Sequence, residues 1–256
     1  MSYSIAIAGK GGTGKTTLTG LLVDHLVRTD RTPVLVVDAD ANSNLNEVLG
    51  VKVDLTLGNL REKIANAEYD QADPLPATMS KRDYLDIHFN RTLIEEHGYD
   101  LIVMGRTQGQ GCYCFVNDLL QEQISRYSNS YRYLVMDNEA GMEHISRGTL
   151  PNVDMIILVS DCSRRGVQAA ARIQELVKEL GLKPAAMKLI VNHAPNGILD
   201  RGTQEEIELH DFDFAGVVPN DPLIYEFDCE GRPTVQLPKT SAARRAFEDI
   251  LSEIIA

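Results

Sequence analysis

The sequence predicts an α/β protein in which helices cover both faces of a mostly parallel sheet of about seven or eight strands. Seven short runs rich in β-branched residues recur along the chain, and each is apolar throughout rather than alternating. Such runs are typical of strands buried on both faces. The stretches between them carry apolar residues at helical spacing. A chain of 256 residues, 43% of them hydrophobic, can bury one large core, so we expect a single domain over residues 1–256.

The predicted strands follow one another from the first residues to the last third of the chain. Their sequences are YSIAIAG, TPVLVVDAD, YDLIVMG, YRYLVMDNE, VDMIILVSD, AMKLIVNH and DFAGVVP. Helices are predicted over Thr16–Thr29 and Gly166–Leu180. Residues 54–90 are harder to interpret, with a loop at DPLPAT between two expected helices. In a sheet of this kind ligands bind at the carboxyl ends of the strands.

The overall charge argues against a nucleic-acid partner. The net charge is −12, whereas proteins that hold nucleic acid present clustered positive charge to the phosphates. No apolar run approaches the roughly 18 residues of a membrane span, and the first residues lack the pattern of an export signal. The final segment RRAFEDILSEIIA has an apolar face, but its polar side is largely acidic, so we expect it to dock on the core. We therefore expect a cytoplasmic protein without a membrane partner.

A phosphate-binding motif follows the first predicted strand. GKGGTGKT, residues 9–16, satisfies G-x-x-x-x-G-K-[ST] between a strand and a helix, which predicts a P-loop NTPase fold. Backbone N–H groups of the glycine-rich loop and the helix N-terminus would bind phosphates. Lys15 would reach the β- and γ-phosphates, and the Thr16 hydroxyl would bind Mg²⁺. The predicted nucleotide contacts are Gly9, Gly11, Gly12, Thr13, Gly14, Lys15, Thr16 and Thr17.

Acidic residues follow two of the other strands. Asp38 and Asp40 in VVDADANSN lie at the carboxyl edge, where a carboxylate can orient the attacking water and hold Mg²⁺ through its water shell. Asp38 has an alternative interpretation as the cap of the next turn. DNEAG fits a Walker B and switch II segment, in which Asp137 contacts a Mg²⁺-bound water and Gly141 donates its N–H to the γ-phosphate.

The loop also contains a second lysine, Lys10. The pattern G-K-G-G-x-G-K-T resembles the deviant Walker A motif of the MinD, nitrogenase iron protein and ArsA group. This resemblance implies that Lys10 reaches across a nucleotide-bound homodimer to the partner's phosphates, as an arginine finger does. It also implies that Asp40 is catalytic, with Asp38 supporting it. The alternative for Lys10 is a solvent-exposed loop residue.

The nucleotide base is expected near the last two strands. Asn192 lies at the end of a predicted strand, and its amide offers a donor and an acceptor to the adenine edge, although such residues are often only turn formers. GVVPNDPLIYEFDCEGRP resembles the adenine-side loop of the same group, with Pro219, Asn220 and Asp221 near the base. Because no N-K-x-D guanine signature is present, we expect ATP or ADP rather than GTP.

Two cysteines, Cys112 and Cys114, lie in the glycine-flanked stretch GQGCYC. A disulfide between residues i and i+2 is strained, but in an extended backbone both thiols can hold one Ni²⁺ or Zn²⁺. Such ions normally take four ligands, so a two-fold-related chain would supply the other two thiolates. The alternative is a pair of free thiols packed near a loop. Cys162 and Cys229 have no partner at ligand spacing.

Five motifs in this order resemble the CooC-type ATPases, the nickel-insertion accessory proteins of carbon monoxide dehydrogenase. They are GKGGTGKTT, DADANSNL, GQGCYC, DNEAGMEH and VNHAP. The resemblance implies a homodimer that serves a client nickel enzyme, either a carbon monoxide dehydrogenase or an acetyl-CoA synthase, with Ni²⁺ or Zn²⁺ as the metal. The six histidines are scattered, which argues against bulk nickel storage. Two alternatives are a MinD- or ParA-like switch without metal delivery and a small-molecule ligase of related fold.

Overall fold

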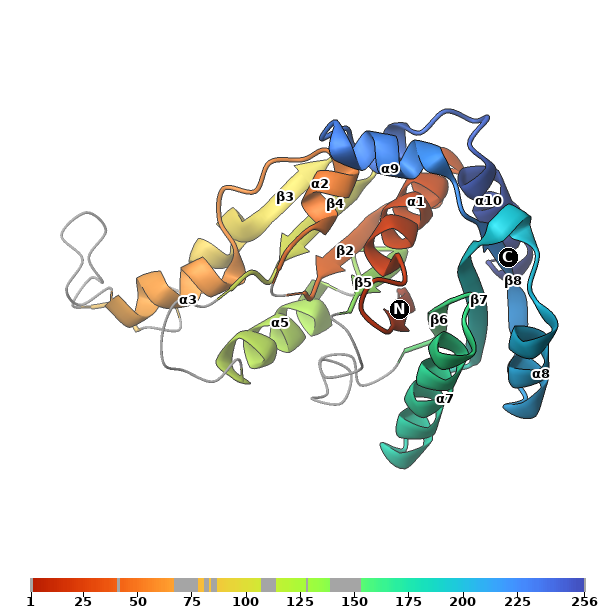
Figure 1. Ribbon diagram of the computed structural model, residues 1–256. Helices are drawn as coiled ribbons and strands as arrows, with labels where there is room; N and C mark the ends of the chain where they lie inside the picture. The colour runs from red at the N-terminus through yellow and green to blue at the C-terminus, as the bar shows by residue number, and fades with distance from the viewer. Residues whose placement is uncertain are drawn as a thin grey trace.

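An eight-stranded sheet forms the centre of the molecule (Figure 1). The computed structural model describes residues 2–40, 42–66, 78–80, 83, 87–106, 114–127, 129–138 and 153–255, with the backbone alone at 61, 64–66 and 114–119. The strand order is β3-β4-β2-β5-β1-β6-β7-β8. The strands are β1 Tyr3–Gly9, β2 Val34–Asp38, β3 Leu93–Glu96, β4 Tyr99–Val103, β5 Tyr133–Asp137, β6 Met155–Asp161, β7 Ala186–Ala194 and β8 Phe214–Pro219.

Every strand pair in this sheet is parallel except β3–β4. The seven predicted runs form seven of the strands, which confirms the predicted fold class. The eighth, β3, pairs antiparallel with β4 at one edge. The chain crosses from β1 to β2 through α1, so the central strands end at the same edge of the sheet.

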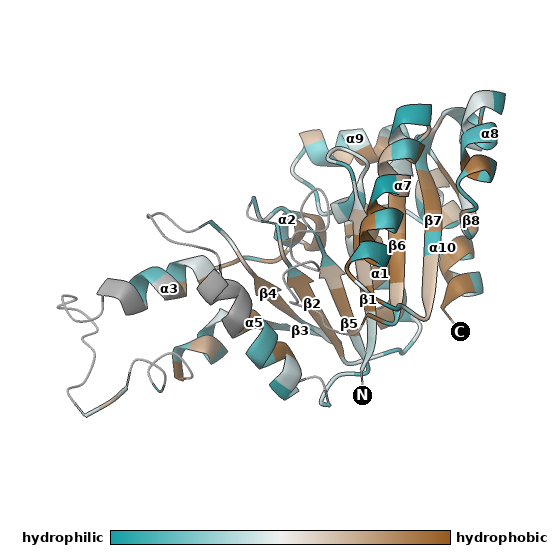
Figure 2. Cartoon of the chain, turned by 90° about the horizontal axis from the view of Figure 1, so that it is seen from below, coloured by the Kyte–Doolittle hydropathy of each residue, from teal (hydrophilic) through white to brown (hydrophobic). Residues whose placement is uncertain are grey.

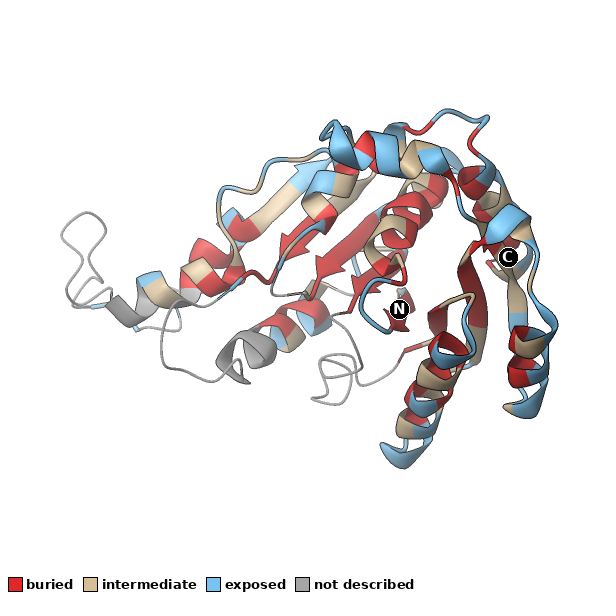
Figure 3. Ribbon diagram, viewed as in Figure 1, coloured by how far each residue is buried: buried red, intermediate tan, exposed pale blue. Residues whose placement is uncertain are grey.

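Helices lie on both faces, as predicted (Figures 1 and 2). One face carries α1 Lys15–Arg28, α2 Leu45–Leu49, α9 Pro222–Cys229 and α10 Ala242–Ile254. The other face carries α3 Leu57–Asn66, α5 Cys114–Tyr127, α7 Arg164–Glu179 and α8 Arg201–Leu209. Short 3-10 turns are η1 Asn90–Thr92, η2 Pro195–Gly197 and η3 Thr234–Gln236. Alternate residues of the strands therefore enter two apolar cores, and burial is concentrated in the sheet (Figure 3).

The helices α1 and α7 match the predicted helices within a few residues. Helix α7 begins where the Ser163 hydroxyl accepts a hydrogen bond from the Gly166 N–H at 3.0 Å. This contact satisfies one of the free N–H groups of the first turn. In the segment 54–90, α3 is the first of the two expected helices, and most of the second falls outside the described residues.

The last helix, α10, packs against β8 and α1. Its apolar face is buried through Ala243, Phe247 and Leu251, as predicted for docking on the core. Arg244 is 5% exposed and bonds Asp24 of α1 at 2.6 Å. Among the described helices, none combines the length and apolarity needed to cross a membrane.

Candidate functional site

The phosphate loop connects the end of β1 to the start of α1, as predicted. A Cβ on Gly9 would lie 2.2 Å from the Val159 carbonyl oxygen of β6, so the loop passes close to the neighbouring strand. Gly14 has a φ of 85°, and a Cβ there would lie 2.4 Å from the Asn192 amide nitrogen. Both positions therefore need glycine: the first for close approach and the second also for its left-handed backbone.

The two lysines of the loop have different environments. Lys15 is 8% exposed, and its ammonium donates to the Lys10 carbonyl oxygen at 3.3 Å. The Thr13 hydroxyl donates to the same carbonyl at 2.9 Å. The Lys10 side chain itself is exposed. Lys15 thus contacts its own loop, while the Lys10 side chain is exposed at the surface.

Asp38 of β2 and Asp137 of β5 lie side by side in register at the carboxyl edge. Asp38 is fully buried, and its two oxygens accept the Asp40 and Leu45 N–H groups, each at 3.1 Å. Burial, with a further contribution from the charge of Asp137, raises the pKa of Asp38 to about 7. Asp38 therefore does act as a cap, since its carboxylate holds the start of α2.

Asp137 is 1% exposed. Burial raises its pKa to about 6, opposed by the nearby Thr16 hydroxyl and the Lys15 ammonium. Among the described residues, neither carboxylate oxygen has a hydrogen-bond partner of good geometry. A buried carboxylate in this state costs free energy, and a divalent cation beside Thr16 would satisfy it.

Asp40 lies two residues beyond Asp38 and is half-buried. Its carboxylate accepts the Asn42 N–H at 2.7 Å, and its carbonyl accepts the Ser43 N–H at 3.1 Å. These contacts form a turn that holds the backbone of Asp40 at the strand end. The carboxylate is consequently positioned by a local turn on the same sheet edge as Asp137.

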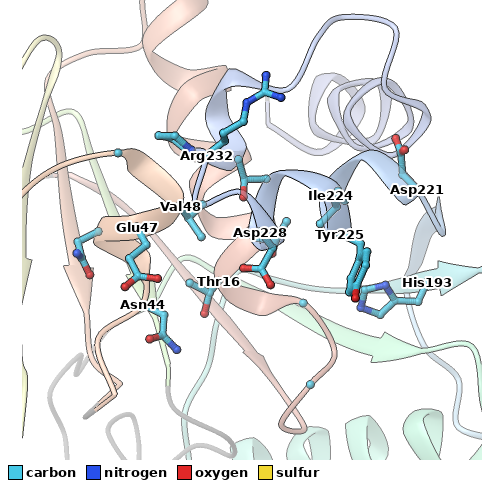
Figure 4. Close-up of a pocket in the computed structure, with 18 of the residues that line it drawn as sticks. Thr16, Asn44, Glu47, Val48, His193, Asp221, Ile224, Tyr225, Asp228 and Arg232 are labelled. Carbon is cyan, nitrogen blue, oxygen red and sulfur yellow. The ribbon is translucent and has the colours of Figure 1, made fainter.

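A pocket of about 1120 Å³ opens beside the loop (Figure 4). Its floor is formed by Gly12, Gly14, Thr16 and Thr17. His193 and Tyr225 lie on one side of Thr16, and Asn44 and Glu47 of the α2 region lie on the other. The pocket is large enough for a nucleotide whose phosphates lie on the loop.

His193, Tyr225, Asp228 and Arg232 also line the pocket but were not named individually from the sequence. The last three belong to residues 216–233, the segment that was expected on the adenine side. His193 is the last residue of the predicted strand AMKLIVNH and lies in β7, with a φ of 59°; burial lowers its pKa while Asp161 opposes the shift. Its position beside Asn192 was the available signal. Tyr225 and Asp228 lie on α9, which the tertiary structure brings to the same pocket as the phosphate loop.

The residues predicted near the base are in different environments. Asn192 is 3% exposed, and its amide donates to the Thr13 carbonyl oxygen at 2.9 Å. Asp221 is also buried, and its carboxylate accepts the Ser241 hydroxyl at 2.6 Å, so it ties the start of α9 to that of α10. Burial alone would raise the pKa of Asp221, but these hydrogen bonds lower it. Asn220 lines the pocket and is exposed, while Pro219 ends β8.

Three predicted residues lie wholly or partly outside the described part of the chain. Gly141 and Cys112 fall outside the described residues, and Cys114 is described by its backbone alone, as the first residue of α5. Cys114 is helical, so the extended backbone that was considered for the cysteine pair does not include Cys114. Elsewhere in the described chain, no three His, Cys, Asp or Glu side chains gather as metal ligands.

The fold and this site define a P-loop nucleotide-binding protein. Residues 4–235 match the CobQ/CobB/MinD/ParA nucleotide binding domain, and the chain belongs to this family. It is 39% identical over 254 residues to an uncharacterised ATP-binding protein of Methanocaldococcus jannaschii, covering 98% of each chain. It is 30% identical over 237 residues to the carbon monoxide dehydrogenase accessory protein CooC of Rhodospirillum rubrum, covering 89% of this chain and 87% of the relative.

Solved structures agree on the fold. The septum site-determining protein MinD of Pyrococcus horikoshii, solved as its Mg-ADP complex, is similar with a TM-score of 0.72. The match covers 100% of this chain and 96% of that chain at 23% sequence identity. At this level of identity the comparison establishes the common fold.

Proposed function

We propose that the protein is a Mg²⁺-dependent ATPase that works as a homodimer and assists metal insertion into a nickel enzyme. The observation that supports the ATPase activity most strongly is the buried Asp137 carboxylate beside the phosphate loop: the Thr16 and Thr19 hydroxyls lie near it, but among the described residues neither oxygen accepts a hydrogen bond of good geometry. The loop can bind phosphates through its N–H groups, and the buried carboxylate can accept a cation. Together they fit a nucleotide bound with Mg²⁺. Family membership supports the same assignment.

In the proposed reaction each residue has a separate task. The loop N–H groups and Lys15 would bind the β- and γ-phosphates, and Thr16 and Asp137 would hold Mg²⁺. Bound Mg²⁺ neutralises charge on the phosphate oxygens. Asp40 orients the attacking water, and its turn through Asn42 keeps the carboxylate at the edge of the sheet. Asp38 supports Asp40 through the hydrogen bond to its N–H.

Dimerisation is proposed from Lys10. Its side chain is exposed although it belongs to a loop whose other lysine is buried. An exposed cation at the mouth of a phosphate site can act on a second copy of the chain, where it would stabilise charge on that copy's nucleotide. Nucleotide would then join the two chains.

The metal cargo is proposed to bind through Cys112 and Cys114. Two thiolates from each of two chains would complete a four-ligand set for Ni²⁺ or Zn²⁺. The 30% identity to the CooC protein supports a client of the same kind, a carbon monoxide dehydrogenase or the related acetyl-CoA synthase. Support for this metal site comes from the sequence, because Cys112 lies outside the described residues and Cys114 is described by its backbone alone.

The test compares cysteine variants for hydrolysis and metal content. Cys112→Ser and Cys114→Ser should retain basal Mg²⁺-dependent ATP hydrolysis but lose bound Ni²⁺ or Zn²⁺ after dialysis. Cys229→Ser is the matched control, since Cys229 is exposed at the end of α9. This variant should keep both ATP hydrolysis and bound metal. If the wild type hydrolyses ATP but retains no metal, the MinD- or ParA-like switch becomes the better assignment.

A further inference from the structure

The side chain of Asn192 lies against the phosphate loop, on the side that faces the protein interior rather than the pocket. Asn192 lies near the carboxyl end of β7, and its register partner on β6 is Asp161. Its amide nitrogen donates to the Thr13 carbonyl oxygen at 2.9 Å across a sequence separation of 179 residues. A Cβ at Gly14 would lie only 2.4 Å from this nitrogen. Asn192 therefore contacts the backbone of the loop directly.

We propose that Asn192 is a positioning residue that aims the Gly14 N–H into the phosphate site. The peptide between Thr13 and Gly14 is planar and trans, so its C=O and N–H point in opposite directions. Asn192 holds the C=O on the protein side, which turns the N–H toward the pocket that Gly14 lines. A phosphate bound in the loop would accept a hydrogen bond from that N–H.

A second carbonyl of the loop is held in a comparable way. The Thr13 hydroxyl and the Lys15 ammonium both donate to the Lys10 carbonyl oxygen. These donors belong to the loop and to α1, whereas Asn192 comes from a distant strand. Asn192 thus ties the loop to the sheet edge near β7.

The burial of Asn192 favours this role over direct contact with the base. The side chain is 3% exposed, and its carbonyl oxygen is buried and has no hydrogen-bond partner among the described residues. One of its amide hydrogens is already used by Thr13. Asn220, His193 and Tyr225 line the pocket, whereas Asn192 is not among its described lining residues. We therefore expect Asn192 to increase the affinity for the phosphate groups of a nucleotide, whichever base the nucleotide carries.

The experiment measures binding of three ligands in the presence of Mg²⁺: inorganic tripolyphosphate, ATP and GTP. Isothermal titration compares wild type with Asn192→Leu, which keeps the number of side-chain heavy atoms but cannot donate, and with Asn192→Ala. Asn196→Gly is the matched control, because Asn196 is exposed on the same strand-end segment and has a φ of 53° that glycine tolerates. Circular dichroism establishes that each variant is folded.

Loss of one buried hydrogen bond should weaken tripolyphosphate and ATP alike, by about tenfold, and leave the ATP-to-GTP ratio unchanged. Unchanged tripolyphosphate affinity in Asn192→Leu would overturn the inference, and a selective loss of ATP would return Asn192 to the base. If Asn192→Ala fails to fold, Asn192→Leu decides. The inference rests on the proposed nucleotide site, and absence of binding by the wild type would instead overturn that proposal.

Discussion

Asp38 and Asp137 are register partners on adjacent strands, and both carboxyl groups are shielded from solvent at the edge of the sheet. Asp38 is bonded to two backbone N–H groups, whereas Asp137 has no such partner among the described residues. Burial raises the pKa of each, and the charge of Asp137 raises that of Asp38 further. The pair is therefore suited to hold a cation and is unfavourable when ionised without one.

The first prediction concerns pH. Both folded pKa values lie above the ordinary value of 3.8, so between about pH 4 and 7 the folded chain binds more protons than the unfolded chain. In metal-free protein this pair should therefore lower the free energy of unfolding as the pH rises through that window. Urea unfolding at pH 5 and pH 8 measures the effect.

The control for this prediction is Asp137→Asn, which removes one charge and the repulsion that it exerts on Asp38. The decrease in stability between pH 5 and pH 8 should become smaller in this variant. An identical pH dependence in wild type and variant would show that other groups determine it.

Arg244 supplies a second prediction, about stability. Its side chain is 6% exposed, and its guanidinium bonds Asp24 at 2.6 Å, Glu248 at 2.9 Å and the Leu237 carbonyl oxygen at 2.6 Å. Arg244→Ala removes these bonds and should cost about 3–5 kcal/mol in urea unfolding. Arg245→Ala, at the exposed neighbouring position, is the control and should change stability by less than about 0.5 kcal/mol. If Arg244→Ala and Arg245→Ala change the free energy of unfolding equally, the buried hydrogen bonds and ion pairs of Arg244 do not contribute to stability.

The third prediction concerns hydrolysis within one chain. Lys15→Ala and Asp40→Ala should each abolish ATP turnover, because these residues act on the phosphate and the water. Neither belongs to the apolar core, so the thermal midpoint should remain within a few degrees of wild type. Steady-state phosphate release measures the effect, and wild-type turnover in either variant removes that residue from the mechanism.

The fourth prediction separates the exposed lysine from the buried one. Lys10→Ala should hydrolyse ATP poorly and should lose nucleotide-dependent dimerisation. Analytical ultracentrifugation with and without a non-hydrolysable ATP analogue measures the dimer. A dimer of unchanged strength in this variant would exclude contact between Lys10 and the nucleotide of the partner.

The parts of the structure that were predicted from sequence depend on local signals. The phosphate loop is a contiguous motif, and strands such as β1 and β6 are apolar runs that need burial on both sides. Strand β3 was not identified, because Leu93–Glu96 is short, partly exposed and stabilised by antiparallel pairing with β4. Its position depends on a neighbour rather than on its own pattern.

The pocket was harder to predict for the same reason. Tyr225 and Asp228 line it because the tertiary structure brings α9 and the phosphate loop to the same pocket. The bond from Asn192 to Thr13 joins residues 179 positions apart, so no local pattern could indicate it. By contrast, the carboxylates of Asp38 and Asp137 were expected at one sheet edge because parallel strands end together.

The central claim is that two chains share one metal ion through Cys112 and Cys114. The most direct measurement is a titration of purified protein with Ni²⁺ or Zn²⁺ that records bound metal per chain and oligomeric state together. A shared site predicts one ion per two chains, a dimer strengthened by metal through linkage, and loss of both in Cys112→Ser. One ion bound to each monomer, or metal retained after both thiols are removed, would contradict it.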